Sequence, residues 1–295
     1  MASSSPPPEE VFIDVVGLGG SSAQLSEEDK VKDTYQDPVE AKVLQLTRHR
    51  LNFTSIVSGH RSVFNPGRGY AFHRAVPLPD GTVFITGASG NDYMRHSCML
   101  YNGKTVLYRQ ESEQGISTVN LVACNQHVYL IGGKWCEAYD LEAKKMKRVE
   151  APLSPHLSGG VCAFNGNVLL VGGIQCQTVE MYLTEERHWA EVTILSENWY
   201  NIACIQVTKQ EVLVFGAGTR QTWLLNVETG SLKSTGELPE SVHDSNMIEN
   251  VPVLHRGAVY CYIGDTEPTL AKYDVSSGVW SIAGQARTGG CCAML

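Results

Sequence analysis

The sequence predicts an all-β fold in which repeated four-stranded units stack around an axis as a six-bladed propeller. Three observations favour it: five short apolar strands end in glycine at intervals of 40 to 48 residues, a hairpin of constant length follows each, and a strand rich in small residues precedes each. A repeat of this length is typical of solenoids and propellers. The five glycines are Gly87, Gly132, Gly172, Gly216 and Gly264.

The hairpin after each glycine is marked by two large apolar residues seven positions apart. Turn-forming or polar residues such as Ser276-Ser277-Gly278 lie between them. The two strands of an antiparallel hairpin return such anchors to the same face of a sheet, so each pair predicts the two outer strands of a unit. The pairs are Tyr101 with Tyr108, Tyr139 with Met146, Tyr182 with Trp189, Leu225 with Leu232, and Tyr273 with Trp280.

The first strand of each unit is expected in a segment rich in small residues, joined by a polar turn to the glycine-ending strand. A single four-stranded sheet cannot bury both of its faces, so the units must cover one another. The expected first strands are Gly69–Val76, Thr118–Cys124, Gly159–Phe164, Asn201–Val207 and Glu249–His255. The corresponding units are residues 69–110, 116–150, 157–193, 199–235 and 247–283.

A sixth unit is predicted from the two ends of the chain, residues 11–56 together with 287–295. Val11–Leu18 runs into Gly19-Gly20 like the other glycine-ending strands, and Leu46 and Phe53 repeat the interval of seven. The C-terminal segment would supply the missing first strand and close the ring, which removes an exposed sheet edge. Residues 11–295 then form one domain, residues 1–10 a disordered leader, and residues 21–40 an acidic insertion.

The repeats resemble kelch repeats. The resemblance rests on a diglycine after the second strand, Tyr-Asp at the end of the third and Trp in the fourth, as in Gly132-Gly133 with Tyr139-Asp140. It covers roughly residues 69–295 and implies a propeller that recognises a protein or peptide through the loops at one end. Some enzymes with kelch repeats are copper-radical oxidases or iron-dependent specifier proteins, and this sequence does not match their ligand patterns.

Composition narrows the classes of function. The 23 basic and 31 acidic side chains give a net charge of −8, which disfavours broad nucleic-acid binding. No apolar run approaches the roughly 18 residues of a membrane helix, and the first residues lack the features of a secretory signal. Nine cysteines without a CxxC pair indicate reduced thiols. We therefore expect a cytoplasmic protein, with the nucleus as an alternative.

A basic rim is the strongest candidate for a binding site. In an antiparallel unit, the connections after the second and fourth strands leave the same end of the sheet, and several of these carry cations or aromatic side chains. Arginine and aromatic residues anchor protein interfaces, and arginine pairs with carboxylates, so an acidic or phosphorylated segment is the expected ligand. Dispersed solvated charge, or a rim masked by residues 21–40, are alternatives. The candidate residues are Arg61, Arg68, Asn91, Arg95, Lys134, Trp135, Trp199, Tyr200, Arg220, His243 and Arg287.

Two other classes of function stay open. Cys292-Ala293-Met294-Leu295 fits a prenylation pattern, although no polybasic stretch precedes it and a terminal strand explains it better. No HExxH, Gly-x-Ser-x-Gly or paired CxxC motif occurs, so no catalytic residue, metal ligand or cofactor is predicted. An enzyme with a metal-dependent or other small-molecule site at the channel mouth is the alternative to a binding scaffold, which we expect as a monomer or a subunit of a hetero-complex.

Overall fold

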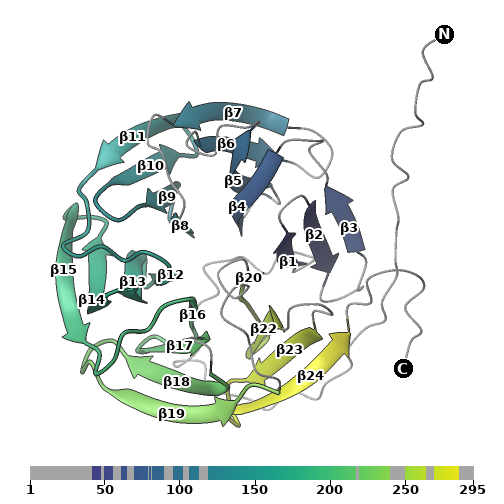
Figure 1. Ribbon diagram of the computed structural model, residues 1–295, viewed down its shortest axis with the longest axis vertical. Coiled ribbons are helices and arrows are strands. Elements are labelled where there is room, and N and C mark those ends of the chain that lie inside the picture. The colour runs from purple at the N-terminus through teal and green to yellow at the C-terminus, as the bar shows by residue number, and fades with distance from the viewer. Residues whose placement is uncertain are drawn as a thin grey trace.

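The computed structural model describes residues 42–47, 50–55, 61–64, 70–78, 80, 82–89, 96–101, 106–112, 119–216, 219–239, 250–263 and 269–285. These residues form six four-stranded antiparallel sheets. Five of the sheets consist of four consecutive strands and surround a common centre, with the first strand of each nearest to it (Figure 1). An all-β propeller with four antiparallel strands per blade is therefore confirmed.

The five blades follow one another in chain order around the ring. The first two are β4 (Tyr70–Pro77), β5 (Val83–Ser89), β6 (His96–Tyr101) and β7 (Val106–Ser112), then β8 (Asn120–Cys124), β9 (His127–Ile131), β10 (Cys136–Asp140) and β11 (Lys145–Val149). The next two are β12 (Gly160–Phe164), β13 (Asn167–Gly173), β14 (Cys176–Leu183) and β15 (His188–Ile194), then β16 (Ile202–Gln206), β17 (Glu211–Gly216), β18 (Gln221–Asn226) and β19 (Leu232–Glu237). The last is β21 (Val253–His255), β22 (Ala258–Ile263), β23 (Thr269–Asp274) and β24 (Val279–Gln285).

The interval of seven marks true hairpin partners in four of these blades. The residues of each predicted pair face each other across the two outer strands: Tyr139 with Met146, Tyr182 with Trp189, Leu225 with Leu232, and Tyr273 with Trp280. In the blade β4–β7 the prediction is wrong. An irregularity in the register pairs Tyr108 with Leu100 and Tyr101 with Val106.

The hydrophobic cores lie between neighbouring blades. Tyr129 and Ile131 of one blade pack in a single cluster with Leu170, Tyr182 and Trp189 of the next. The indole Nε1 of Trp189 also donates a hydrogen bond of 2.9 Å to the Glu150 carbonyl oxygen, beyond the end of β11 in the preceding blade. Each blade thus depends on its neighbours to keep its apolar faces from water.

The sixth sheet is not assembled as predicted. It contains β20 (Asn250–Val251), β1 (Lys42–Thr47), β2 (Arg50–Ser55) and β3 (Arg61–Phe64), in that order. The structure therefore shows five blades of consecutive strands rather than six. Residues 11–20 and 287–295, expected as its second and first strands, lie outside the described residues, and closure by the C-terminal strand is not confirmed. The strand paired with β1 on the inner side is β20.

The proline at position 252 explains how β20 joins this sheet. The predicted strand Glu249–His255 is divided there: β20 pairs with β1, whereas β21 pairs with β22. Proline has no N–H group to donate to a ladder, so it interrupts strand pairing at this position. The chain passes at Pro252 from one sheet to the next, and β1 contacts both β4 and β22.

Gly172, near the end of β13, allows a close approach between a blade and the next connection. Its φ is +59°, and a Cβ there would lie 2.5 Å from the Trp199 carbonyl oxygen. We expect Gly172→Ala to lower the free energy of unfolding by roughly 2 to 4 kcal/mol, because it adds a backbone clash to an unfavourable φ. Denaturant unfolding followed by circular dichroism measures this.

Gly257→Ala is the matched control. Gly257 also has a positive φ, +74°, but no atom lies within 4 Å of a Cβ built on it. Only the conformational cost of roughly 1 kcal/mol is expected. Equal losses in the two variants would contradict the steric explanation.

Candidate functional site

The connections that follow the second and fourth strands meet at one end of the described blades. The Gly173 N–H donates to the Trp199 carbonyl at 2.7 Å, and the Ile174 N–H donates to the Leu157 carbonyl at 2.8 Å. We call this end the loop face, made of residues 132–135, 150–159, 174–175, 195–201 and 219–220. The sequence-based expectation that these connections share one end is confirmed for these residues.

The loop face exposes only some of the predicted binding residues. Lys134, Tyr200 and Arg220 are exposed. The Arg220 Nε donates a hydrogen bond of 2.8 Å to the Leu238 carbonyl, and its Nη2 lies 3.9 Å from Glu237 Oε2. Part of its charge is therefore balanced at the surface.

The two tryptophans proposed for the rim have packing roles. Trp199 is buried in the core between two blades, and its ring lies 4.4 Å from that of Trp223. Trp135 is half-buried against the preceding core and lies against Gly132. Trp199 offers no exposed ring to a partner, because Trp223 and the neighbouring core residues cover it.

The described structure does not test whether the remaining candidates form a basic rim. Arg61 is not in a connection between sheets as expected, since it begins the strand β3. Arg68, Asn91, Arg95, His243, Arg287 and Cys292 lie outside the described residues.

Two exposed apolar side chains of the loop face were missed by the sequence analysis. Leu153 is 63% exposed and Ile174 is 46% exposed, compared with 41% for Tyr200. Leu153, Ile174 and Tyr200 lie on three different connections whose backbones are linked by hydrogen bonds. Ile174 directly follows the diglycine Gly172-Gly173, where a turn was expected. An apolar residue in a turn is the sequence signal that could have identified it as exposed.

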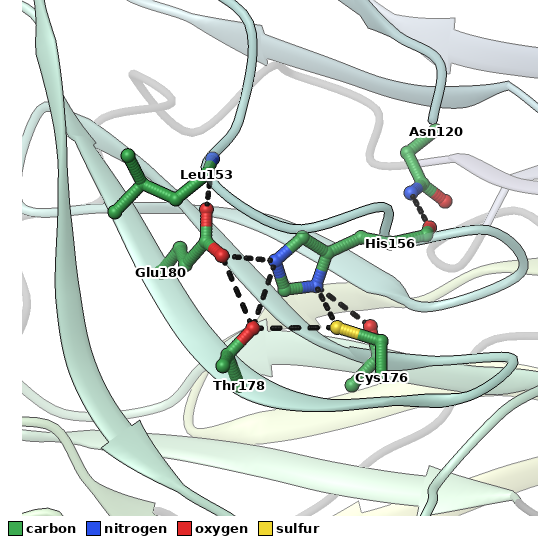
Figure 2. A network of polar contacts seen from close by, with 7 residues as sticks. Asn120, Leu153, His156, Cys176, Thr178 and Glu180 are labelled. Carbon is green, nitrogen blue, oxygen red and sulfur yellow. Dashed lines mark hydrogen bonds and ion pairs between the residues drawn. The ribbon is translucent and has the colours of Figure 1, made fainter. Parts of the chain in front are cut away.

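A buried polar network includes the backbone N–H of Leu153 (Figure 2). His156 comes from the connection between β11 and β12, whereas Cys176, Thr178 and Glu180 occupy alternate positions of β14 and so share one face of it. The His156 Nε2 lies 3.1 Å from Glu180 Oε1, and both side chains are fully buried. The alternation of Cys176, Thr178 and Glu180 can be seen in the sequence. Their contact with His156 cannot, because it arises from tertiary packing.

The hydrogen-bond partners define the protonation state of His156. Its Nδ1 lies 2.7 Å from the Gly172 carbonyl, which can only accept, and its Nε2 faces Glu180. Glu180 also accepts from the Thr178 hydroxyl at 3.1 Å and the Leu153 N–H at 2.8 Å, as a carboxylate does. Both ring nitrogens must therefore donate, and His156 is an imidazolium.

The electrostatics agree with this assignment. Burial alone would lower the pKa of His156, but its hydrogen bonds and charge interactions with Cys176 and Glu180 raise the pKa to about 9. Burial alone would raise the pKa of Glu180, but hydrogen bonds from His156, Ser154 and Leu153 lower it. The His156 carbonyl also accepts a 2.7 Å hydrogen bond from Asn120 of β8, so the network joins two blades.

This arrangement offers little to acid–base or metal chemistry. Neither ring nitrogen of His156 is free to accept a proton. Among the residues that the structure describes, no group of three or more His, Cys, Asp or Glu side chains is placed to hold a metal ion. The network is a buried clamp that fastens the connection 150–159 to the strand β14.

Neither a scan against protein-family models nor a search of curated proteins finds a match to this chain. In the described part of the chain, no helix has the length and apolar character needed to cross a membrane.

The clamp predicts a dependence of stability on pH. Because the folded pKa of His156 is about 9 and the unfolded value is 6.5, its contribution is complete below pH 6.5 and lost as pH rises through 9. For Glu180 the sign is reversed, and stability is lost as pH falls through its lowered pKa. Because Cys176 and Glu180 both raise the pKa of His156, we expect Glu180→Gln to lose less stability than wild type between pH 6.5 and 9.5, measured by denaturant unfolding.

His188→Asn is the control for this experiment, because His188 lies on the outer strand β15 with its side chain 47% exposed. It should keep the wild-type profile. If Glu180→Gln also keeps that profile, His156 is not held as an imidazolium by Glu180.

Proposed function

We propose that this chain is a non-enzymatic kelch-type propeller that binds a protein or peptide through its loop face. The observation that carries the proposal is the exposure of Leu153, Ile174 and Tyr200 on connections fixed by backbone hydrogen bonds and by the clamp. Exposed apolar groups on a polar surface are typical of interaction sites. A preformed surface also binds with a smaller loss of conformational entropy.

An acidic or phosphorylated ligand segment would meet two exposed cations on the loop face, Lys134 and Arg220, beside two exposed acids, Glu150 and Glu197. Lys134 is exposed on the connection next to Leu157, which packs toward Gly133, and half of the Arg220 side chain is exposed. Apolar side chains of a peptide would contact Ile174 and Tyr200, while its acidic groups would face these cations. We propose that the protein acts in the cytoplasm, as a monomer or as a subunit of a hetero-complex.

An enzyme is the less favoured candidate. The only described cluster that combines a thiol, an imidazole and a carboxylate has both imidazole nitrogens occupied by acceptors. A catalytic base needs a free lone pair, so this cluster gives no support to acid–base catalysis.

Replacing Ile174 with a charged residue tests the proposed surface. We expect Ile174→Asp to weaken partner binding at least about tenfold, because an apolar contact is replaced by a desolvated charge. The measurement is quantitative affinity capture, followed by titration with the identified partner. Lys134→Glu should weaken binding mainly at low salt if the ligand is acidic.

Ile282→Asp is the matched control, since Ile282 on the outer strand β24 is 51% exposed, close to the exposure of Ile174. It should bind as wild type does. If both aspartate variants retain the partner equally while remaining folded, the loop face is not the binding site.

A further inference from the structure

Cys176 has an environment unlike that of the other described cysteines. Burial raises the pKa of Cys98 and Cys124 to about 12 and moves those of Cys136, Cys204 and Cys261 in the same direction. For Cys176, burial also raises the pKa, but hydrogen bonds with His156 and Thr178 and the charge of His156 outweigh burial and lower it.

The geometry explains the difference. The sulfur of Cys176 lies 3.7 Å from the Nδ1 of His156 and 3.3 Å from the hydroxyl oxygen of Thr178. Because His156 is an imidazolium paired with Glu180, a positive charge faces the sulfur at pH values below about 9. Such a charge stabilises a thiolate relative to a thiol.

The protons of the network can be assigned in both states of the sulfur. The Thr178 hydroxyl donates to Glu180 Oε1, so its oxygen can accept the S–H of the thiol. His156 already carries both of its ring protons and cannot take a third, so ionisation of Cys176 releases the proton to solvent. The thiolate then accepts from His156 Nδ1–H alongside the Gly172 carbonyl.

Cys176 is the first residue of β14 and is 4% exposed, and its chain neighbours Gln175 and Gln177 are exposed. Cys124, Cys162 and Cys204 have similar exposed fractions, so the local charge and not the exposure distinguishes Cys176. The other described cysteines are strand residues packed in the cores between or within blades.

We propose that Cys176 is a site of oxidation by hydroperoxides, which convert its thiolate into a sulfenic acid. The sulfur attacks the terminal oxygen of the hydroperoxide, a sulfur–oxygen bond forms, and the O–O bond breaks. The leaving alkoxide or hydroxide takes a proton from water. The sulfur is oxidised by two electrons and the peroxide is reduced by two. The imidazolium of His156 favours the thiolate over the thiol, and Glu180 is linked to the sulfur through that ring and through the Thr178 hydroxyl.

Site-resolved trapping tests the proposal with the full chain. The protein is treated with hydrogen peroxide between pH 5 and 10, sulfenic acid is trapped with dimedone, and each cysteine peptide is quantified by mass spectrometry. At pH 7 we expect Cys176 to be labelled at least about tenfold faster than Cys98, Cys124, Cys136, Cys204 or Cys261, since one pKa unit changes the thiolate fraction about tenfold. The midpoint of its pH–rate profile should lie below the value of about 8.5 for a free thiol.

Labelling of Cys176 no faster than that of Cys136 and Cys261 would overturn the proposal, because equal labelling reports unfolding. A midpoint at or above that of a free thiol would also overturn it. The wild-type profile gives a decision even if a variant fails to fold.

Glu180→Gln tests the role of the imidazolium. Its Cys176 midpoint should rise and its labelling rate at pH 7 should fall, while Glu191→Gln, an exposed residue opposite Glu180 on β15, should behave as wild type. An unchanged midpoint in folded Glu180→Gln would overturn the assignment of the imidazolium as the cause.

Discussion

Burial between neighbouring blades is the interaction on which the molecule depends. The cluster that joins the blades β8–β11 and β12–β15 contains Tyr129, Tyr182 and Trp189, and the corresponding cluster on the next side contains Phe164, Trp199 and Leu225. A fully buried large side chain contributes roughly 1.5 to 3 kcal/mol, so no single sheet retains its stability without its neighbours. The connections between blades then fix the position of one blade relative to the next. His156 lies in such a connection, and Gly172 of β13 contacts another through Trp199.

The buried ion pair between His156 and Glu180 carries a desolvation penalty that its contacts must offset. Removing two charges from water is unfavourable unless each is paired and hydrogen-bonded, and here Glu180 accepts from His156, Thr178 and Leu153. One set of contacts thereby has three results: it fixes the connection from which Leu153 projects, holds an imidazolium away from water, and places that charge beside Cys176. The proposed docking surface and the proposed oxidation site share a support but make separate predictions.

Local patterns in the sequence were sufficient for the blades but not for the site. The strand anchors Tyr182 and Trp189 are close in the chain, so spacing alone identified their hairpin. Trp199 was predicted at the rim because its covering residue, Trp223, comes from the next blade. The composition of the sixth sheet was predicted wrongly for the same reason. Pro252 is visible in the sequence, but β1, the partner of β20, is distant in the chain. His156 and Glu180 are likewise brought together only by tertiary packing.

The pairing of β1 with β20 also constrains the order of assembly. Gln45 faces Asn250, about 200 residues away, whereas nearly every other ladder joins strands adjacent in the chain. Contacts of such separation form late, because a long loop must close before any energy is gained. During synthesis the five blades can form one after another as the chain leaves the ribosome. The sheet of residues 42–64 lacks its fourth strand until Asn250 and Val251 have emerged. The earliest-made sheet is thus among the last to be completed.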